Sequence, residues 1–257
     1  RSLVYYLALL RKGKQSGYRT LLHGAGLGPL SPRGWAKCTA ALNECADTIV
    51  FRERESLAAA RKHGINAPEL ILGADGAAGT SVSASPRENV LLVCPRWGRG
   101  APPFPAEYAR AAAEIAAKRG WKLRYIAMNV RQDLPLCRAL VSETGGEAAA
   151  APEDTAALTR LFASARLTVS MRLHALTLSY LAGTPAFGID GDGRIAAFAK
   201  ECGIPYRAVE ECGDIAAALE EALTAETPDA AIWNERLAAG RAALARALRA
   251  PEKEKEK

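Results

Sequence analysis

The segment LTVSMRLHALTLSYL, residues 167–181, decides the fold. Its first part is a short apolar run typical of a buried strand, which we expect at Leu167–Ser170, and its second part has the pattern of a helix, which we expect at Leu173–Leu181. The segment is one of a series, since an apolar strand at residues 90–94 is likewise followed by a helical pattern at residues 105–119. Strands that alternate with helices in this way predict βαβ units and a parallel sheet.

Residues 76–88 interrupt this alternation, because glycine, serine and proline are crowded there between two apolar strands. Such a composition is typical of a linker, and we therefore expect three parts. These are an N-terminal Rossmann-like domain at residues 1–80, a complete doubly wound domain at residues 88–225, and a helix at residues 228–250 that packs back on the body. The first part has about three expected strands where such a domain normally has five or six, so we expect it to lack its first βαβ portion.

Composition narrows the class of protein. The chain has 257 residues, of which 49% are hydrophobic and 24% charged, and this profile excludes disordered and fibrous proteins. No segment approaches the ~20 apolar residues that a membrane span requires. The six cysteines form no C-x-x-C pair and only three histidines are present, so we expect neither a metal site nor a disulfide framework. Cysteines used in this way are typical of a cytoplasmic protein.

The charge favours anionic partners. The chain has 34 Lys and Arg against 28 Asp and Glu, a formal net charge of +6. Phosphorylated metabolites, anionic lipid surfaces and nucleic acid would all suit such a chain. Aromatic residues make up only 6% of the chain and no basic stretch is interleaved with them, which argues against nucleic acid.

The densest candidate site is SMRLHA, residues 170–175. Arg172 and His174 fall in the first turn of the expected helix, where unsatisfied N–H groups and the helix dipole disfavour cations by about 0.3–1 kcal/mol each. A bound phosphate or carboxylate would remove this conflict. A structural explanation stays open, in which Ser170 caps the helix and His174 is a satisfied core histidine. Arg172 would then pair with an acid such as Asp190.

Two further loops follow strands of the same expected sheet. Arg96 comes after the strand at residues 90–94, at the edge where parallel sheets bind ligands, and it either reaches the same anion or lies in a solvated loop. Residues 188–194, GIDGDGR, end the next strand along the chain after the SMRLHA turn, and their glycines permit close approach to a ligand. Two aspartates without other oxygen donors make a weak metal site, and a tight turn with Asp192 near a helix start is the alternative.

The first half of the chain has weaker signals. Gly24, Gly26 and Gly28 form a glycine-rich turn, but its G-x-G-x-G spacing differs from the G-x-G-x-x-G of a dinucleotide loop. Asp75 follows an apolar strand, and it either faces a cleft or begins the linker. Residues 51–56, FRERES, indicate the start of a helix with alternating surface charge.

Together these segments resemble the bacterial polysaccharide pyruvyl transferases, most closely the type that modifies secondary cell-wall polysaccharide for S-layer anchoring. The matching segments lie at residues 1–6, 24–29, 51–53, 56, 74–75, 94–96, 170–175, 188–190 and 194. The resemblance implies a GT-B-like α/β fold, in which two Rossmann-like domains face a cleft. It also implies phosphoenolpyruvate as a co-substrate without a further cofactor, and a lipid-linked or polymeric glycan as acceptor.

The activity implied by the resemblance is transfer of the enolpyruvyl group of phosphoenolpyruvate to a sugar with two free hydroxyls, N-acetylmannosamine, as a cyclic ketal with release of phosphate. In the family, the Arg and His of the R-L-H turn hold and activate the donor, which carries onto Arg172, Leu173 and His174. Arg96 matches a basic donor-binding residue of the family, and Arg194 stands where a lysine is usual. For the acceptor side, the carried-over residues are Gly24, Gly26, Gly28 and Asp75.

The chemistry of these residues agrees with such a donor, because phosphoenolpyruvate has both a phosphate and a carboxylate. We expect Arg172 and Arg96 to clamp the anion, and His174 to protonate the enol carbon or to neutralise the leaving phosphate. Two other functions stay open: a GT-B glycosyltransferase with a nucleotide-sugar donor, and a truncated homologue that binds an anion without catalysis. We expect a cytoplasmic protein, with peripheral contact to anionic lipid at the inner face of the plasma membrane and no nucleic-acid partner.

Overall fold

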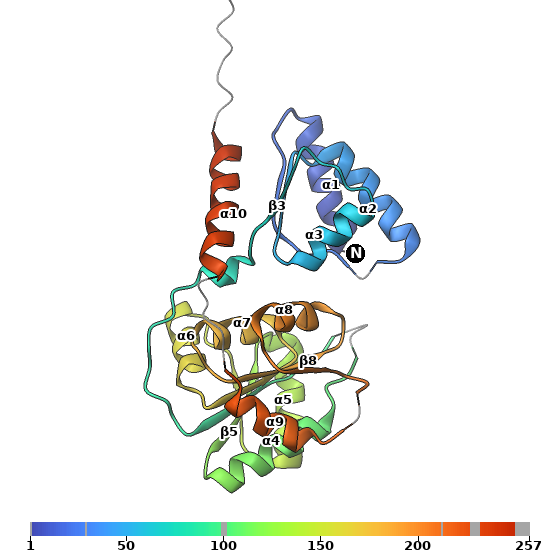
Figure 1. The fold of residues 1–257 in the computed structure, drawn as a ribbon. Coiled ribbons are helices and arrows are strands. Elements are labelled where there is room, and N and C mark those ends of the chain that lie inside the picture. The colour runs from blue at the N-terminus through green and yellow to red at the C-terminus, as the bar shows by residue number, and fades with distance from the viewer. Residues whose placement is uncertain (1, 29, 99–101, 212, 227–231, 250–257) are drawn as a thin grey trace, which may run out of the picture. The chain divides into compact units, whose positions relative to one another are not determined.

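The computed structural model describes residues 2–28, 30–98, 102–211, 213–226 and 232–249. The chain divides into two compact units. Unit 1 comprises Arg1–Gly79 together with Ala231–Lys257, and unit 2 comprises Thr80–Ala230. Both are layered α/β structures, and each is described by itself (Figure 1).

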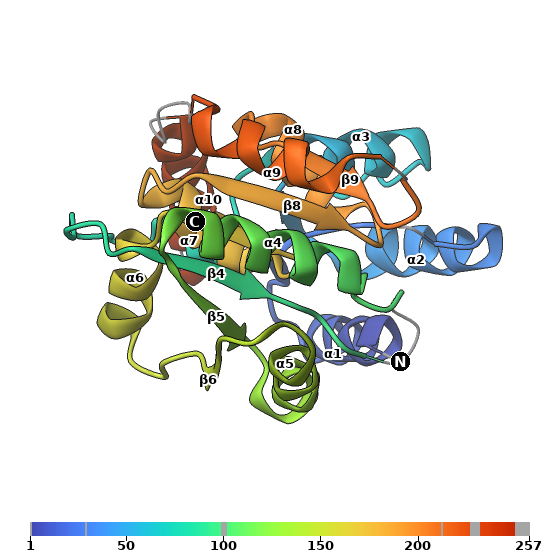
Figure 2. The ribbon, with the colours of Figure 1, turned by 90° about the horizontal axis from the view of Figure 1, so that it is seen from below.

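Unit 2 contains a six-stranded parallel sheet in the order β6-β5-β4-β7-β8-β9. In Figure 2 the sheet can be traced from β6 through β5 and β4 to β8 and β9. The strands are β4 (Val90–Cys94), β5 (Lys122–Ala127), β6 (Glu147–Ala150), β7 (Leu167–Ser170), β8 (Ala186–Asp190) and β9 (Tyr206–Ala208). Numbered along the unit, this is the 3-2-1-4-5-6 order of dinucleotide-binding Rossmann folds. The strand order reverses between β4 and β7, and ligands of such sheets bind beside that point, beyond the carboxyl ends of the strands.

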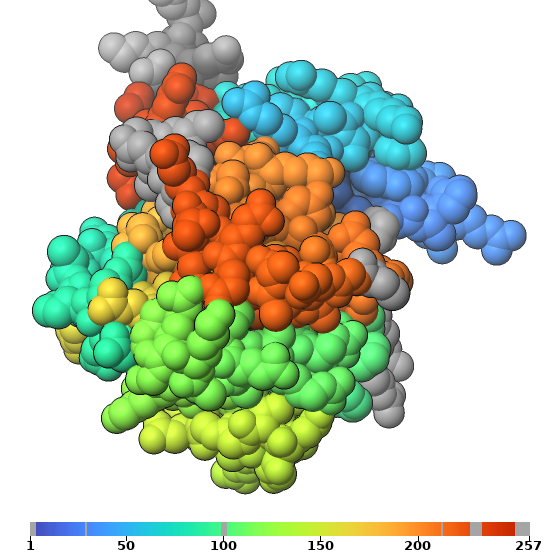
Figure 3. Space-filling view, turned by 60° about the horizontal axis from the view of Figure 1, so that its bottom comes forward, coloured from blue at the N-terminus to red at the C-terminus, as the bar shows by residue number. Residues whose placement is uncertain are grey.

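Helices cover both faces of this sheet (Figure 1). They are α4 (Ala106–Arg119), α5 (Val130–Thr144), α6 (Thr155–Ser164), α7 (Leu173–Leu181), α8 (Arg194–Cys202) and α9 (Ile215–Thr224). Alternate residues of β4 serve the two faces, since Leu91 and Val93 pack with α4, α5 and α9, whereas Leu92 and Cys94 pack with α6 and α7. All residues of β4 and β7 are buried, as expected for strands covered on both sides. Figure 3 shows α9 beside α4 on the surface, where Arg119 forms an ion pair with Glu220.

Residues 80–89 contain no helix or strand, and Arg87 holds them against the body of unit 2. Its guanidinium donates to the carbonyl oxygens of Ala163 at 2.8 Å and Ala165 at 3.0 Å, at the end of α6. It also donates to the carbonyl of Gly183 at 2.7 Å, just after α7. The last carbonyls of a helix lack intrahelical partners and lie at the negative end of its dipole. One cation therefore satisfies the ends of two helices.

Unit 1 contains a three-stranded parallel sheet in the order β1-β2-β3. Its elements are α1 (Ser2–Gln15), β1 (Leu21–Ala25), α2 (Pro32–Cys45), β2 (Thr48–Phe51), α3 (Arg54–Lys62), β3 (Glu69–Leu72), the short helix η1 (Gly76–Gly79) and α10 (Ile232–Leu248). Leu10, Leu42, Ile49 and Phe51 form the centre of the core between the first three helices and the sheet. From the other end of the sequence, α10 returns to contact all three strands. Gly240 permits this approach, because a Cβ there would lie 2.9 Å from Nε2 of His23.

Part of the expected helix at residues 228–250 falls on positions 228–231 and 250, outside the described residues. Within the described ranges, no helix has both the length and the apolar character needed to cross a bilayer.

Candidate functional site

Three loops at the carboxyl edge of the unit 2 sheet carry the expected cationic residues. Cys94 of β4 pairs with Ser170 of β7, which in turn pairs with Gly188 of β8. Because these strand ends are in register, the loops that carry Arg96 and Arg172 leave the sheet at the same level. The two loops flank the point where the strand order reverses, which is the usual ligand-binding position in this type of sheet.

The turn between β7 and α7 is built around Ser170. Its buried Oγ accepts a hydrogen bond from the backbone N–H of Arg172 at 2.8 Å, and lies 3.0 Å from the carbonyl oxygen of the same residue. The N-cap position of α7 is Arg172, which makes no side-chain cap hydrogen bond. The expectation that Ser170 caps the helix is therefore wrong: its hydroxyl closes the turn before the helix begins. The N-cap side chain therefore binds none of the first backbone N–H groups of α7.

Asp133, which the sequence analysis missed, holds the guanidinium of Arg172. This carboxylate is fully buried and accepts a hydrogen bond from Nη2 of Arg172. It also accepts from the backbone N–H of Trp97 at 3.1 Å and from that of Asn129 at 2.9 Å. The three donors belong to the loops after β7, β4 and β5, so a single buried acid joins three loops of the binding edge.

The alternative in which Arg172 pairs with an acid is confirmed, but the acid is Asp133 and not Asp190. The Asp190 carboxylate accepts from the backbone N–H groups of Gly193 at 2.9 Å and Ile195 at 3.0 Å. It is therefore engaged in shaping the loop that leads into α8. An acid at the start of this loop lies close to the loop's own backbone amides, which occupy its oxygens.

Arg172 retains binding capacity after these contacts. Its side chain is 20% exposed, and its Nε is buried without a hydrogen-bond partner. A buried donor without an acceptor costs about 1–3 kcal/mol. His174, in the first turn of α7, is exposed, so the alternative of a core histidine is wrong. Leu173, between the two, is half-buried.

Arg96 and Arg194 meet on the carboxylate of Asp192. Arg96 donates through Nη1 at 2.7 Å. Arg194 donates through Nε at 2.9 Å and Nη2 at 2.5 Å. Burial alone would raise the pKa of Asp192, but the hydrogen bonds and charges of the two arginines outweigh it and hold this pKa well below its usual value. Within the described ranges, no three His, Cys, Asp or Glu side chains gather as a metal-binding group.

Cys94, at the end of β4, lies at the same edge but has the wrong chemistry for a nucleophile. Burial is the main cause that raises the pKa of its thiol far above the usual value, with smaller contributions from Cys137 and Asp133. Burial also raises the pKa of Cys137 to about 12. Thiols in such surroundings stay protonated, so these cysteines are packing residues.

The carboxyl edge of the unit 1 sheet brings the expected glycine-rich turn next to Arg52. Gly24 and Gly28 have positive φ angles of +67° and +111°, a conformation that favours glycine. A Cβ at Gly26 would lie 2.8 Å from Nη2 of Arg52, so the guanidinium packs directly on this turn. Arg52 donates to Asp75 at 3.3 Å, which places Asp75 at the same edge.

The prediction of a surface-charged helix start at FRERES is wrong for its first charged residues. The side chains of Arg52 and Glu53 are only 17% and 15% exposed, and they pair with each other at 2.7 Å. Glu53 also accepts a hydrogen bond from the hydroxyl of Ser56, which itself accepts from the backbone N–H of Leu27 at 2.8 Å. The place of Arg52 in the sequence could have revealed this network, because it directly follows a buried strand and so lies at the carboxyl edge of the sheet.

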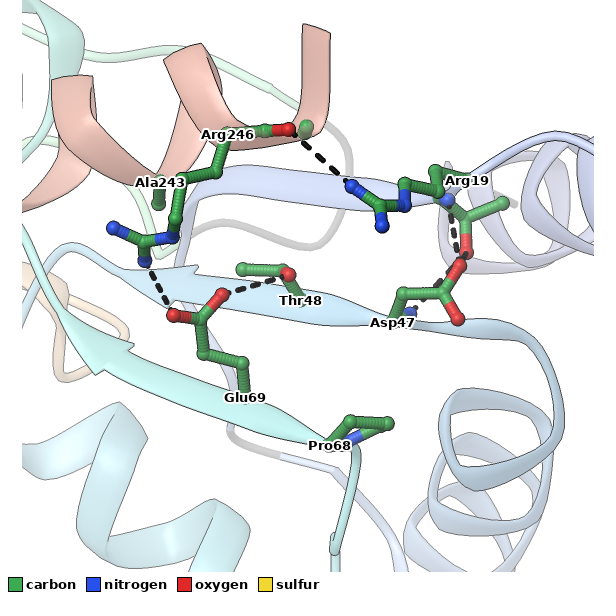
Figure 4. A pocket seen from close by; sticks show the side chains of 9 residues that line it. Arg19, Asp47, Thr48, Pro68, Glu69, Ala243 and Arg246 are labelled. Carbon is green, nitrogen blue, oxygen red and sulfur yellow. Dashed lines mark hydrogen bonds and ion pairs between the residues drawn. The ribbon is translucent and has the colours of Figure 1, made fainter. Parts of the chain in front are cut away.

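A hollow of about 330 Å³ lies at the opposite edge of the unit 1 sheet, at the amino ends of its strands (Figure 4). Its acids are engaged: Asp47 accepts from the backbone N–H of Thr20 at 2.8 Å, and Glu69 accepts from Thr48 at 3.0 Å and from Arg246. The charged groups there tie α10 to the sheet. Both this position and these contacts indicate a structural role.

Comparison with solved structures identifies the fold. The chain is similar to Anabaena Alr3699/HepE in complex with UDP and glucose, with a TM-score of 0.63 and 14% identity over 94% of this chain and 74% of that chain. It is also similar to a putative UDP-N-acetylglucosamine 2-epimerase from Listeria monocytogenes, with a TM-score of 0.60 and 15% identity over 95% of this chain and 72% of that chain. At such identities the likeness concerns the fold alone, and it confirms the GT-B-like architecture of two Rossmann-like units.

Comparison with protein families is more specific. No curated protein matches the sequence. The family model described as polysaccharide pyruvyl transferase matches residues 1–193, a segment that includes Arg96, Asp133, Arg172 and His174 and ends just before Arg194. The chain belongs to the polysaccharide pyruvyl transferase family.

Proposed function

We propose that this protein transfers the enolpyruvyl group of phosphoenolpyruvate to two hydroxyls of a sugar in a cell-wall polysaccharide precursor, N-acetylmannosamine, as a cyclic ketal. The observation that carries the proposal is Arg172. Its guanidinium lies at the start of α7 beside the point of strand reversal, and its buried Nε has no partner. Fork-shaped donors and a helix N-terminus suit a ligand with a phosphate and a carboxylate.

The charge balance of the unit 2 edge supports an anionic donor. Arg96, Arg172 and Arg194 face two carboxylates, those of Asp133 and Asp192. The edge therefore gathers several cationic side chains beside the start of α7, and His174 lies in the first turn of that helix. In a partly buried setting such a cluster attracts a multiply charged anion more strongly than in water.

The proposed reaction balances without a further reactant. A proton adds to C3 of the enolpyruvyl group, and one acceptor hydroxyl forms a bond to C2. The bond between C2 and the bridging phosphate oxygen then breaks, and the second hydroxyl bonds to C2 to close the ketal ring. Of the two hydroxyl protons released, one replaces the proton given to C3 and the other leaves with the phosphate.

His174 has two roles open to it in this scheme. As an imidazolium it either protonates C3 or neutralises charge on the departing phosphate. Its exposed position in the first turn of α7 lets it reach a ligand held by Arg172. Both roles predict a loss of turnover when the imidazole is removed.

We place the acceptor sugar at the carboxyl edge of unit 1. A Cβ at Gly28 would meet open space and one at Gly24 only ordinary contacts, while Gly26 lies against Arg52. The side chain of Asp75 is 22% exposed. A carboxylate beside a glycine-rich turn suits the hydroxyl groups of a sugar. A lipid-linked acceptor would bring this protein to the inner face of the plasma membrane from the cytoplasm.

The test is phosphate release from phosphoenolpyruvate in the presence of lipid-linked N-acetylmannosamine. We expect release that depends on both substrates and is abolished by Arg172→Ala, with Glu143→Gln at an exposed ion pair as a control that keeps activity. Phosphoenolpyruvate binding without release, with acceptor present, would instead identify a non-catalytic anion-binding homologue.

The second candidate is a glycosyltransferase with a nucleotide-sugar donor, because a solved structure of similar fold contains UDP and glucose. Calorimetric titration separates the two functions. Phosphoenolpyruvate should bind to the wild-type chain and UDP should not, whereas tight binding of UDP alone would replace the proposed donor.

A further inference from the structure

The carboxylate of Asp192 is bound in the way a ligand carboxylate would be. Arg194 grips it with two nitrogens, Nε and Nη2, at 2.9 Å and 2.5 Å. Arg96 adds a third donor at 2.7 Å from another loop. Arginine pairs bind the carboxylates of substrates with this same fork geometry.

Within the described residues, Asp192 accepts no hydrogen bond from the backbone of its own loop. The backbone amides at the start of α8 are bound by Asp190, which accepts from Gly193 and Ile195. The described hydrogen bonds of Asp192 go only to the two guanidinium groups. Glycines precede and follow it: Gly193 has a φ of +83°, and a Cβ at Gly191 would lie 2.5 Å from Cγ of Pro102, so both positions favour glycine. The carboxylate can leave without unravelling the helix start.

The other acid of the edge differs in each of these respects. Asp133 is fully buried and binds two backbone N–H groups as well as Arg172. The side chain of Asp192 is 27% exposed, so solvent and ligands can reach it. Of the two acids paired with these arginines, only Asp192 is both accessible and without backbone hydrogen bonds among its described contacts, so a ligand carboxylate could take its place.

We propose that Asp192 is an internal carboxylate that fills the subsite for the donor's carboxylate, and that the donor displaces it on binding. The inference rests on the proposed function and extends it by assigning the two ends of the donor. The carboxylate goes to Arg96 and Arg194, and the phosphate goes to Arg172. In the resting protein Asp192 competes with the donor as a tethered group, which has a high effective concentration at its own site.

The experiment is calorimetric titration of phosphoenolpyruvate, pyruvate and inorganic phosphate into the wild-type chain, Asp192→Asn and Asp192→Ser. Glu143→Gln is the matched control, because it also removes one carboxylate from an arginine pair in unit 2, at an exposed site with Arg110. We expect phosphoenolpyruvate and pyruvate to bind about tenfold more tightly to both Asp192 variants, a difference of about 1.4 kcal/mol. Inorganic phosphate should gain less than phosphoenolpyruvate and pyruvate do, because its own subsite at Arg172 is unchanged.

The outcomes separate this inference from the function on which it rests. Unchanged or weaker binding of phosphoenolpyruvate by both Asp192 variants overturns the exchange, while binding by the wild-type chain keeps the proposed function. A gain for inorganic phosphate as large as that for phosphoenolpyruvate and pyruvate overturns the assignment of the carboxylate end. A lack of phosphoenolpyruvate binding by every chain overturns both. Thermal melting of each variant verifies that it is folded. Because Asn and Ser differ in size, one Asp192 variant still tests the proposal if the other fails to fold.

Discussion

Replacing Asp133 by asparagine tests the link between the fold of unit 2 and its binding edge. The carboxylate accepts three hydrogen bonds, from Arg172 and from the backbone N–H groups of Trp97 and Asn129. The new side chain would keep one accepting oxygen, but its amide group would face a donor. Breaking a buried ion pair from one side costs about 3–5 kcal/mol. Arg172 is 20% exposed and gains some hydration, so we expect the lower end, a loss of about 3 kcal/mol in the free energy of unfolding.

Urea denaturation measures this loss, and a double-mutant cycle assigns its cause. Arg172→Met alone leaves the Asp133 carboxylate buried without its cation, and should also destabilise unit 2. The two substitutions together remove both charges, so the combined loss should be smaller than the sum by about 1–3 kcal/mol. Glu143→Gln should change stability by less than about 1 kcal/mol, as at other exposed ion pairs. A loss under about 1 kcal/mol for Asp133→Asn, or strict additivity in the cycle, would refute the reasoning.

Three further predictions concern other parts of the molecule. Arg87→Ala should lower the free energy of unfolding by about 2–4 kcal/mol, because the carbonyls at the ends of two helices lose their donor. In urea denaturation, Arg87→Lys should recover only part of this loss. Equal stability of the alanine variant and the wild type would contradict the prediction. Gly26→Ala should destabilise unit 1 by about 1 kcal/mol, the low end for overpacking, since the added methyl displaces the guanidinium end of Arg52 from its contacts with Glu53 and Asp75. Gly76→Ala has open space and is the control, so equal melting temperatures for the two variants would count against the close packing. His174→Ala should lower kcat at least tenfold with little change in phosphoenolpyruvate affinity, and undiminished turnover in steady-state kinetics would exclude both proposed roles.

The helices and strands of unit 2 could be predicted from local sequence where their side chains are fully buried. The strand Leu167–Ser170 and the helix Leu173–Leu181 have the bounds expected from their apolar patterns. The strand Glu147–Ala150 shows where this approach fails, because EAAA has no strand propensity and three of its four side chains are exposed. It is a strand because its backbone pairs with β5, in register from Arg124 to Glu147. Pairing at a sheet edge is a non-local property that a single window of sequence does not contain.

At the carboxyl edge of unit 2, too, some features could be predicted from the sequence and others could not. The sequence identified the loops that carry Arg96 and Arg172, since a loop's place at the carboxyl edge follows from the βαβ pattern alone. It did not identify Asp133 as a partner, because an acid in the first turn of a helix is already explained by the helix dipole. Arg52 and Glu53 were misinterpreted as surface charges for a related reason. Which acid meets which arginine depends on loops that come together only in the folded chain.

If phosphoenolpyruvate binds as proposed, the two acids of the unit 2 edge decide which end of the donor supplies the binding energy. Without them, three arginines at one edge would repel each other, and Asp133 and Asp192 relieve this in the resting protein. Exchange of Asp192 for the donor's carboxylate replaces one ion pair with another of the same kind, so this end of the donor contributes little net affinity. In the proposed arrangement the gain in affinity would then arise at the phosphate, which is assigned to the partly exposed guanidinium of Arg172. It follows that a donor analogue that lacks its phosphate should bind weakly to the wild-type chain, even though it fits the carboxylate subsite.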